Sequence, residues 1–156
     1  MLRLERRLSH SPERVWSAIT KVSEFPAWFP GVVNQDLTEG AKLRFDMTSD
    51  QREHMGIPDD EDMSSEGEVV VHDAPRVLEY TWGDEILRWE LTADGDDTAL
   101  VYTDVFDDRE LAAQTGSSWH AVLDLLEAHL DGRDVGTVWE LEAAVHDEYE
   151  RTVKVS

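Results

Sequence analysis

The sequence predicts one α+β domain, residues 1–156, in which a curved antiparallel sheet packs against one long C-terminal helix. Two short helices are expected between the first and second strands. Three observations predict this class. Strand-like alternation recurs at short spacing between residues 67 and 106, the connections there are too short for parallel crossovers, and the hydrophobic period then changes from 2 to 3.6. An apolar fraction of 40% with six tryptophans can fill the core of such a domain.

The N-terminal segment predicts a strand followed by the two short helices. Residues 2–8 alternate apolar with charged side chains, as a half-buried strand does. Ser11 can cap a helix that has Pro12 at its first position. Its apolar stripe consists of Val15, Trp16 and Ile19. Ser23 is the expected N-cap of a second brief turn, which ends at Pro30-Gly31. That turn carries Phe25 and Trp28.

Two further strands and a long loop are expected in the middle of the chain. The strands cover Val32–Leu37 and Leu43–Met47, and a tight turn at Glu39-Gly40 joins them. From Thr48 to Glu66 the chain carries seven acids against one arginine, with no sustained periodicity. We therefore expect a loop over this whole segment.

Four alternating runs then predict an antiparallel meander. They are Gly67–Asp73, Arg76–Trp82, Glu85–Ala93 and Thr98–Phe106. The Asp94-Gly95 step between the last two is a strong hairpin signal. Because every connection is short, neighbouring runs should pair in antiparallel fashion.

The C-terminal third of the chain predicts two helices. The long one covers about residues 109–130 and ends at Asp131-Gly132. Its apolar face consists of Leu111, Trp119, Val122, Leu123, Leu126 and Leu130. A short terminal helix is expected at about 137–150, with Trp139 and Tyr149 as anchors.

Several strings along the chain, in the order of these elements, resemble a known family. They are SPERVWSAIT at 11–20 and WFPG at 28–31; GEV at 67–69, PRVL at 75–78 and YTWG at 80–83; and Gly116, WH at 119–120, LDLL at 123–126 and HL at 129–130. Together they resemble the SRPBCC superfamily, also called START-like or birch-pollen-allergen-like. Within it, the chain is most similar to the family related to the C-terminal domain of the activator of the heat-shock-protein-90 ATPase. The resemblance covers nearly the whole chain.

The resemblance implies a helix-grip fold, in which the sheet wraps around the long helix. Members of the wider superfamily bind hydrophobic ligands in a cavity between sheet and helix, and some are cyclases or hydrolases. The family name implies activation of a chaperone. The matching residues look like packing and turn positions, and the family shares no catalytic triad or cofactor motif.

Alternation and the resemblance together indicate which side chains face inward. The expected ligand contacts are Phe45, Met47, Tyr80, Trp82, Trp89, Tyr102, Asp104, Trp119 and Leu123. We expect a cavity bounded by the rings of Trp82, Trp89, Tyr102 and Trp119, since large aromatic walls bind apolar ligands well. Core packing is the alternative role of each tryptophan.

Asp104 has two opposed interpretations. As a carboxylate at the rim of its strand, it would cap the long helix or pair with an arginine, and its pKa would be lowered. As a polar anchor inside a cavity beside Tyr102, it would be desolvated, and its pKa would be raised.

The sequence lacks the residue patterns that several kinds of catalytic and binding site require. The chain has no cysteine, which excludes thiol catalysis and disulfides. Its six histidines show no metal-ligand spacing, and no Gly-x-Ser-x-Gly elbow or phosphate-binding glycine loop is present. We therefore expect no catalytic residue, no metal site and no cofactor.

Charge narrows the expected partners. With 35 Asp and Glu against 14 Lys and Arg, the net charge is −21, which repels nucleic acids and anionic membranes. The N-terminus lacks the apolar run of a signal peptide, and the uncharged stretch Phe25–Gln35 is too short to span a bilayer. We expect a cytoplasmic monomer or weak dimer with no nucleic-acid partner and no membrane insertion.

Three functions remain open from the sequence. The favoured one is a domain that binds a hydrophobic or amphipathic small molecule between sheet and helix. The second is a protein-interaction domain that engages a chaperone or another protein, which would need an exposed apolar patch. The third is a cyclase-like or hydratase-like enzyme that uses Asp104 and Tyr102 as acid and base.

Overall fold

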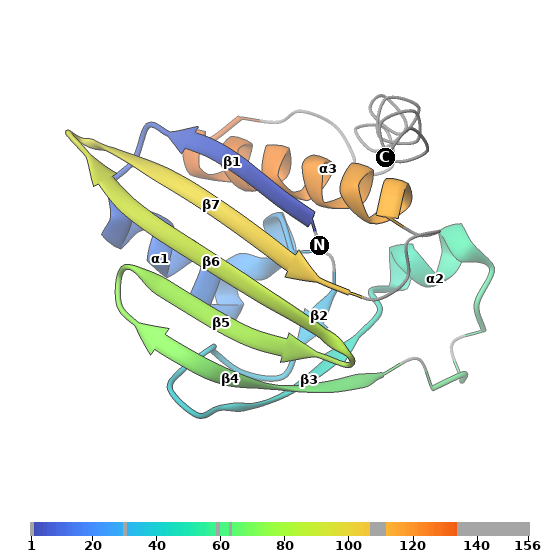
Figure 1. Ribbon diagram of the computed structural model, residues 1–156. Coiled ribbons are helices and arrows are strands. Elements are labelled where there is room, and N and C mark those ends of the chain that lie inside the picture. Colours follow the sequence, from blue (N-terminus) through green and yellow to red (C-terminus); the bar gives the residue numbers. More distant parts are fainter. Residues whose placement is uncertain (1, 30, 59, 63, 107–111, 134–156) are drawn as a thin grey trace.

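A curled antiparallel sheet and a long helix dominate the computed structural model, which describes residues 2–29, 31–58, 60–62, 64–106 and 112–133. For residues 50, 54, 55 and 112–118 only the backbone is described. Within these ranges the sheet has seven strands in the order β1-β7-β6-β5-β4-β3-β2 (Figure 1). The strands are β1 Leu2–Leu8, β2 Val32–Val33, β3 Lys42–Asp46, β4 Ser65–Asp73, β5 Val77–Trp82, β6 Glu85–Asp94 and β7 Asp97–Val105. The helices are α1 Pro12–Thr20, the 3-10 helix η1 Val22–Ala27, α2 Ser49–Met55 and α3 Ala112–Asp131.

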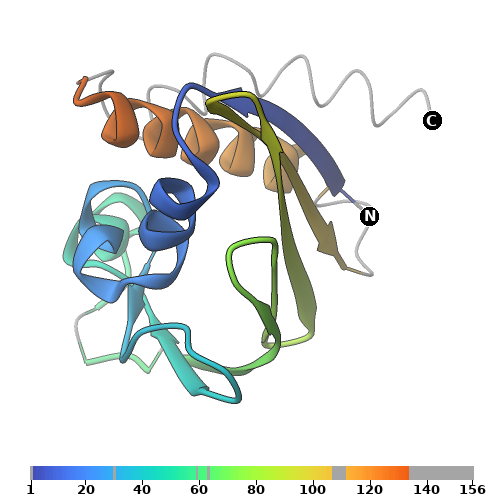
Figure 2. The ribbon, with the colours of Figure 1, turned by 90° about the vertical axis from the view of Figure 1, so that its left-hand side faces the viewer.

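The predicted meander is confirmed: β4, β5, β6 and β7 pair in sequence order, all antiparallel. β1 closes the sheet by pairing with β7, and β3 continues it beyond β4. The sheet curves around the side on which α1, η1 and α3 lie (Figure 2). The predicted α+β fold, with a curved sheet, a long helix and two short helices between the first two strands, is therefore confirmed.

A glycine allows the sheet to bend where β4 meets its neighbours. A Cβ on Gly67 would lie 1.8 Å from the main-chain oxygen of Thr81 and 2.9 Å from the ring of Phe45. The register between β4 and β5 shifts just beyond this point, between Val69 and Val71. Only glycine permits so close an approach of the two strands here.

The two short helices follow the sequence in part. Ser11 caps α1 as predicted, because its hydroxyl accepts a hydrogen bond from the Arg14 N–H at 3.2 Å. The predicted cap at Ser23 is wrong, since η1 begins at Val22. The Asp36 carboxylate accepts the Val22 N–H at 2.8 Å, so a side chain from a later segment satisfies the start of this helix.

The segment Thr48–Glu66, which was predicted as a loop, contains the helix α2, so this prediction is wrong for Ser49–Met55. Thr48 and Gln51 form a capping box at the start of α2, in which each side chain accepts from the other residue's backbone N–H. Gly56, with a φ of +68°, ends the helix in the left-handed conformation. β4 then begins at Ser65, two residues before the predicted start.

The strand predicted over Val32–Leu37 is shorter in the structure. Only Val32–Val33 pair with β3. Leu37 is fully buried, but its N–H donates to the carbonyl of Thr20 at the end of α1, at 2.9 Å. At Leu37 the main chain therefore bonds to the end of α1 and not to a neighbouring strand.

The long helix α3 presents the predicted face to the sheet. Trp119, Val122, Leu123, Leu126 and Leu130 are all buried in the core. Residues 109–111 and the predicted terminal helix at about 137–150 lie outside the described residues. Among the helices that the structure describes, none is long and apolar enough to cross a membrane.

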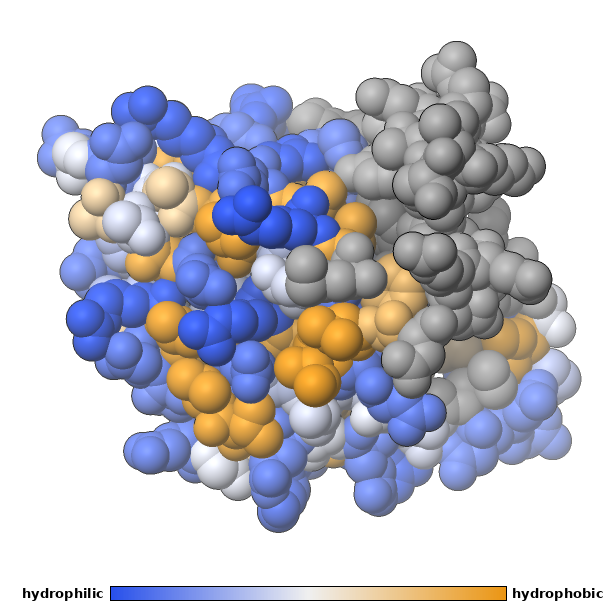
Figure 3. All heavy atoms as spheres, in the orientation of Figure 1, coloured by the Kyte–Doolittle hydropathy of each residue, from blue (hydrophilic) through white to orange (hydrophobic). Residues whose placement is uncertain are grey.

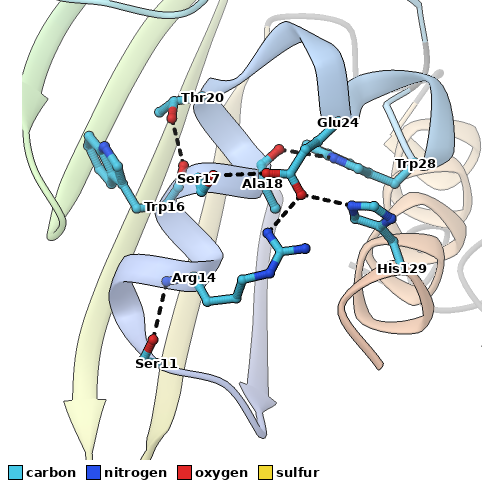
Figure 4. Close-up of polar contacts among 9 residues, drawn as sticks. All are labelled: Ser11, Arg14, Trp16, Ser17, Ala18, Thr20, Glu24, Trp28 and His129. Atoms are coloured by element: carbon cyan, nitrogen blue, oxygen red, sulfur yellow. Dashed lines mark hydrogen bonds and ion pairs between the residues drawn. The ribbon is translucent and has the colours of Figure 1, made fainter. Parts of the chain in front are cut away.

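A half-buried carboxylate links α3 to the two short helices (Figure 4). Glu24 of η1 accepts hydrogen bonds from Arg14 and Ser17 of α1, at 2.7 and 2.9 Å. It also accepts from Nε2 of His129, near the end of α3, at 2.9 Å. These contacts, the Glu24 cluster, hold together the helices that cover the concave face of the sheet.

Candidate functional site

Three of the predicted site rings contact one another on the concave face of the sheet. The centroid of the Trp89 ring lies 4.8 Å from that of Tyr102 and 6.1 Å from that of Trp119. Tyr102 and Trp119 are 4.4 Å apart. Trp89 and Tyr102 are directly opposite each other on β6 and β7, and Trp119 reaches them from α3.

The fourth predicted ring, Trp82, belongs to a different stack. It lies 4.2 Å from Phe45 and 5.5 Å from Phe29, nearly parallel to both. Phe45 also stacks on Tyr80 at 6.2 Å. The four rings therefore do not form one ring-to-ring wall, and the cavity between them stays a prediction.

Asp104 lies on the same face, two residues beyond Tyr102 on β7. Its side chain is completely buried, and neither carboxylate oxygen has a hydrogen-bond partner among the described residues. Burial first and the nearby carboxylate of Glu85 second together raise the pKa of Asp104 to about 7. The burial of Asp104 agrees with the interpretation as a desolvated carboxylate beside Tyr102. Among the described residues it forms neither a helix cap nor an arginine pair, and residues 107–111, where the predicted cap would begin, lie outside them.

The hydroxyl of Tyr102 is the second unpartnered polar group. Tyr102 is fully buried, and its Oη has no hydrogen-bond partner in the part of the chain that the structure describes. Burial raises its pKa, and the charge of Asp104 acts in the same direction. Tyr80 differs, because its Oη accepts a hydrogen bond from Nε1 of Trp89 at 3.3 Å.

Glu85 completes the site and was missed in the sequence. It begins β6 and is half-buried, and burial raises its pKa. Leu87 pairs with Asp104 across the strands, so the residue two before Leu87 faces inward beside Asp104. The inward series Leu87, Trp89 and Leu91, extended back by two residues, would have identified it.

The other predicted contacts are more scattered. Leu123 is buried on the same face of α3 as Trp119. Met47 follows the end of β3 and is half-buried, and its N–H donates to the Asp46 carboxylate. The structure thus brings Trp89, Tyr102, Asp104 and Trp119 together and leaves Phe45, Tyr80 and Trp82 in the adjoining stack.

The chemistry of this site follows from its groups. Two carboxylates close together in an apolar setting disfavour each other's charged form, so the pair takes up a proton more readily than an exposed acid does. An unpartnered phenol and the carboxylate oxygens can bind the polar end of a ligand, while the rings contact its apolar part. No group of three or more His, Asp or Glu side chains among the described residues is arranged to hold a metal ion.

A family model described as "Activator of Hsp90 ATPase homolog 1-like protein" matches residues 9–131. No curated protein matches the chain.

Solved structures share the fold. The crystal structure of CalU16 from Micromonospora echinospora is 20% identical, with a TM-score of 0.72, over 97% of this chain and 86% of that one. The solution structure of the protein encoded by BPP1335 from Bordetella parapertussis is 24% identical, with a TM-score of 0.73, over 96% and 84%. The crystal structure of DynU16, a putative protein in the dynemicin biosynthetic locus, is 21% identical, with a TM-score of 0.66, over 83% of this chain and 46% of that one.

Proposed function

The chain belongs to the family of activator of Hsp90 ATPase homolog 1-like proteins, and we propose that it is a small-molecule-binding domain. Its ligand is a hydrophobic or amphipathic molecule held between the concave face of the sheet and α3. The contacts come from the Trp89, Tyr102 and Trp119 rings and from Asp104.

The observation that carries this proposal is the pair of unpartnered polar groups in an aromatic setting. Buried polar atoms are nearly always hydrogen-bonded, and leaving one unpaired costs about 1–3 kcal/mol. Asp104 and the Tyr102 hydroxyl are both fully buried without a partner among the described residues. A ligand that bonds to them removes this cost, which explains why such groups occupy a core position.

The context of one neighbour favours a small-molecule role. DynU16 is described as a putative protein in the dynemicin biosynthetic locus. The proteins encoded in a biosynthetic locus act on small organic molecules, so a protein of this fold that binds such molecules is consistent with that context.

Native mass spectrometry of the freshly purified protein tests the proposal. We expect an adduct of discrete mass that denaturation releases. In addition, the uncharged apolar dye Nile red should bind saturably at one site. The absence of both an adduct and saturable dye binding would contradict the proposal.

Two matched variants locate the binding site. Tyr102→Phe removes a buried hydroxyl that has no partner among the described residues, so it should keep or raise the stability of the free protein. It should weaken binding of the co-purified ligand about threefold to tenfold, the value of one hydrogen bond. Tyr80→Phe removes a hydroxyl that Trp89 already engages, so it should leave ligand binding unchanged. Equal effects of the two variants on binding would place the ligand elsewhere.

An interaction surface for a protein partner is the second candidate. Ile86 and Val105 are about 40% exposed and lie opposite each other on the convex face of β6 and β7. In Figure 3 the hydrophobic groups on this side of the molecule are small and separated by hydrophilic ones. Ile86→Lys should weaken capture of such a partner and leave Nile red binding unchanged.

A further inference from the structure

We propose that the ligand carries a positive charge, as a protonated amine attached to an apolar or aromatic body. Its ammonium group lies between the carboxylates of Asp104 and Glu85, against the rings of Tyr102 and Trp119. This inference rests on the proposed function and specifies the class of ligand.

The two acids occupy neighbouring inward positions at the end of the β6–β7 pair. Asp104 lies opposite Leu87, and Glu85 is the next inward residue along β6. They are close enough that each alters the pKa of the other. Glu85 is half-buried while Asp104 is fully buried, so the pair extends from the rim of the sheet into the core.

No positively charged side chain among the described residues compensates this pair of acids. None of the ion pairs formed among the described residues includes Asp104 or Glu85. By contrast, Asp124 pairs with Arg6, and Glu79 with Arg88. Burying a carboxylate is costly unless a positive group or hydrogen-bond donors compensate it. An ammonium group supplies both, through its charge and its N–H donors.

The independent observation that points to a ligand here is the phenol of Tyr102. Its Oη is fully buried, has no partner among the described residues, and lies on the same strand face as Asp104. It can accept one N–H of an ammonium group while the carboxylates accept the others.

The aromatic surroundings suit a cation better than an anion or a neutral polar group. Tyr102 and Trp119 are in ring contact at 4.4 Å, and Trp89 adjoins both. Tryptophan and tyrosine faces attract cations, and most strongly when water is excluded.

The charge of the whole chain acts in the same direction. A net charge of −21 raises the local concentration of cations and repels anions.

Isothermal titration calorimetry with two matched ligand series tests the inference. Tryptamine, tryptophol and indole-3-acetate share one body and differ in charge; octylamine, 1-octanol and octanoate do the same with a linear body. For the body that binds, the amine should bind about tenfold tighter than the alcohol or more. The carboxylate should bind most weakly, because two like charges would adjoin it.

Proton release gives a second readout. A cation beside the acids favours their charged forms, so amine binding near pH 7 should release a fraction of a proton. Titration in two buffers of different ionisation enthalpy measures it. The alcohol should release none.

Two variants assign both effects to the site. Asp104→Asn should remove the preference for the amine and most of the proton release, whereas Asp96→Asn, at an exposed turn, should keep both. The inference would be overturned if the alcohol bound as tightly as its amine, or if the preference for the amine survived Asp104→Asn. In either case, saturable Nile red binding would still support the proposed function. Loss of dye binding and of all six probes would overturn both.

Discussion

Replacing Asp104 should show that this residue is kept at a cost to stability. Its pKa in the folded chain is raised to about 7, against about 3.9 for an unfolded aspartate. Asp104 therefore does not lower the free energy of unfolding below the unfolded pKa. It lowers this free energy progressively as the pH rises from about 4 through about 7. We expect Asp104→Asn to raise the free energy of unfolding near pH 8, on the order of a few kcal/mol, and to change it little near pH 4. Urea denaturation over this range measures the difference.

Asp96→Asn is the matched control for Asp104→Asn, because it makes the same chemical change at an exposed position. Asp96 is exposed in the turn between β6 and β7. Its replacement should change stability by less than about 0.5 kcal/mol at every pH. If Asp104→Asn instead lowered stability near pH 8, Asp104 would have a donor in the folded state, and its role as a ligand anchor would be lost.

The Glu24 cluster decides how the helices stay together at the scale of secondary-structure elements. Glu24 accepts from α1 and from α3 while lying on η1 (Figure 4). Burial alone would raise its pKa, but hydrogen bonds from His129, Arg14 and Ser17 lower it. We expect Glu24→Ala to reduce the free energy of unfolding near pH 7 by about 1–3 kcal/mol, since it leaves several donors unpaired. Urea denaturation again measures this loss.

The pH dependence of Glu24→Ala and a control substitution at Glu13 distinguish the loss of these hydrogen bonds from a general effect of removing a negative charge. Because the pKa of Glu24 is lowered in the folded chain, its stabilisation is present above the unfolded value of about 4.3 and is lost as the pH falls through the folded value. The defect of Glu24→Ala should therefore shrink in acid. Glu13→Ala, exposed in the first turn of α1, should cost less than about 1 kcal/mol. Equal losses in the two variants would mean that the cluster does not join the helices.

Net charge is the property that governs the whole molecule. With 35 acids and 14 basic residues, repulsion among carboxylates opposes the folded state. Salt screens this repulsion over about 10 Å at 0.1 M. The thermal unfolding midpoint should therefore rise as sodium chloride is added from near zero, with sucrose at matched osmolality as a control for solvent effects. A midpoint that stayed constant or fell with salt would show that ion pairs already neutralise the surface acids.

Local patterns along the chain are sufficient to specify the architecture. The meander and the buried face of α3 follow from periods of 2 and 3.6, because a side chain's place in the repeat decides which face it joins. The Ser11 cap followed from local signals as well. The α2 helix was also within reach, since Thr48 and Gln51 form its capping box, but apolar periodicity does not detect so short a polar helix.

Only the tertiary structure decided what the inward residues do. Alternation placed Tyr102 and Asp104 on one face, but the raised pKa of Asp104 depends on its burial and on Glu85, which comes from another strand. The separation of Trp82 from the Trp89 ring contacts depends likewise on Phe29, which follows η1, and on Phe45 of β3, because both rings stack on Trp82. Burial and hydrogen bonding depend on contacts between segments that are distant in the sequence. The pattern within one segment predicts which way a side chain points, but not which residues it contacts.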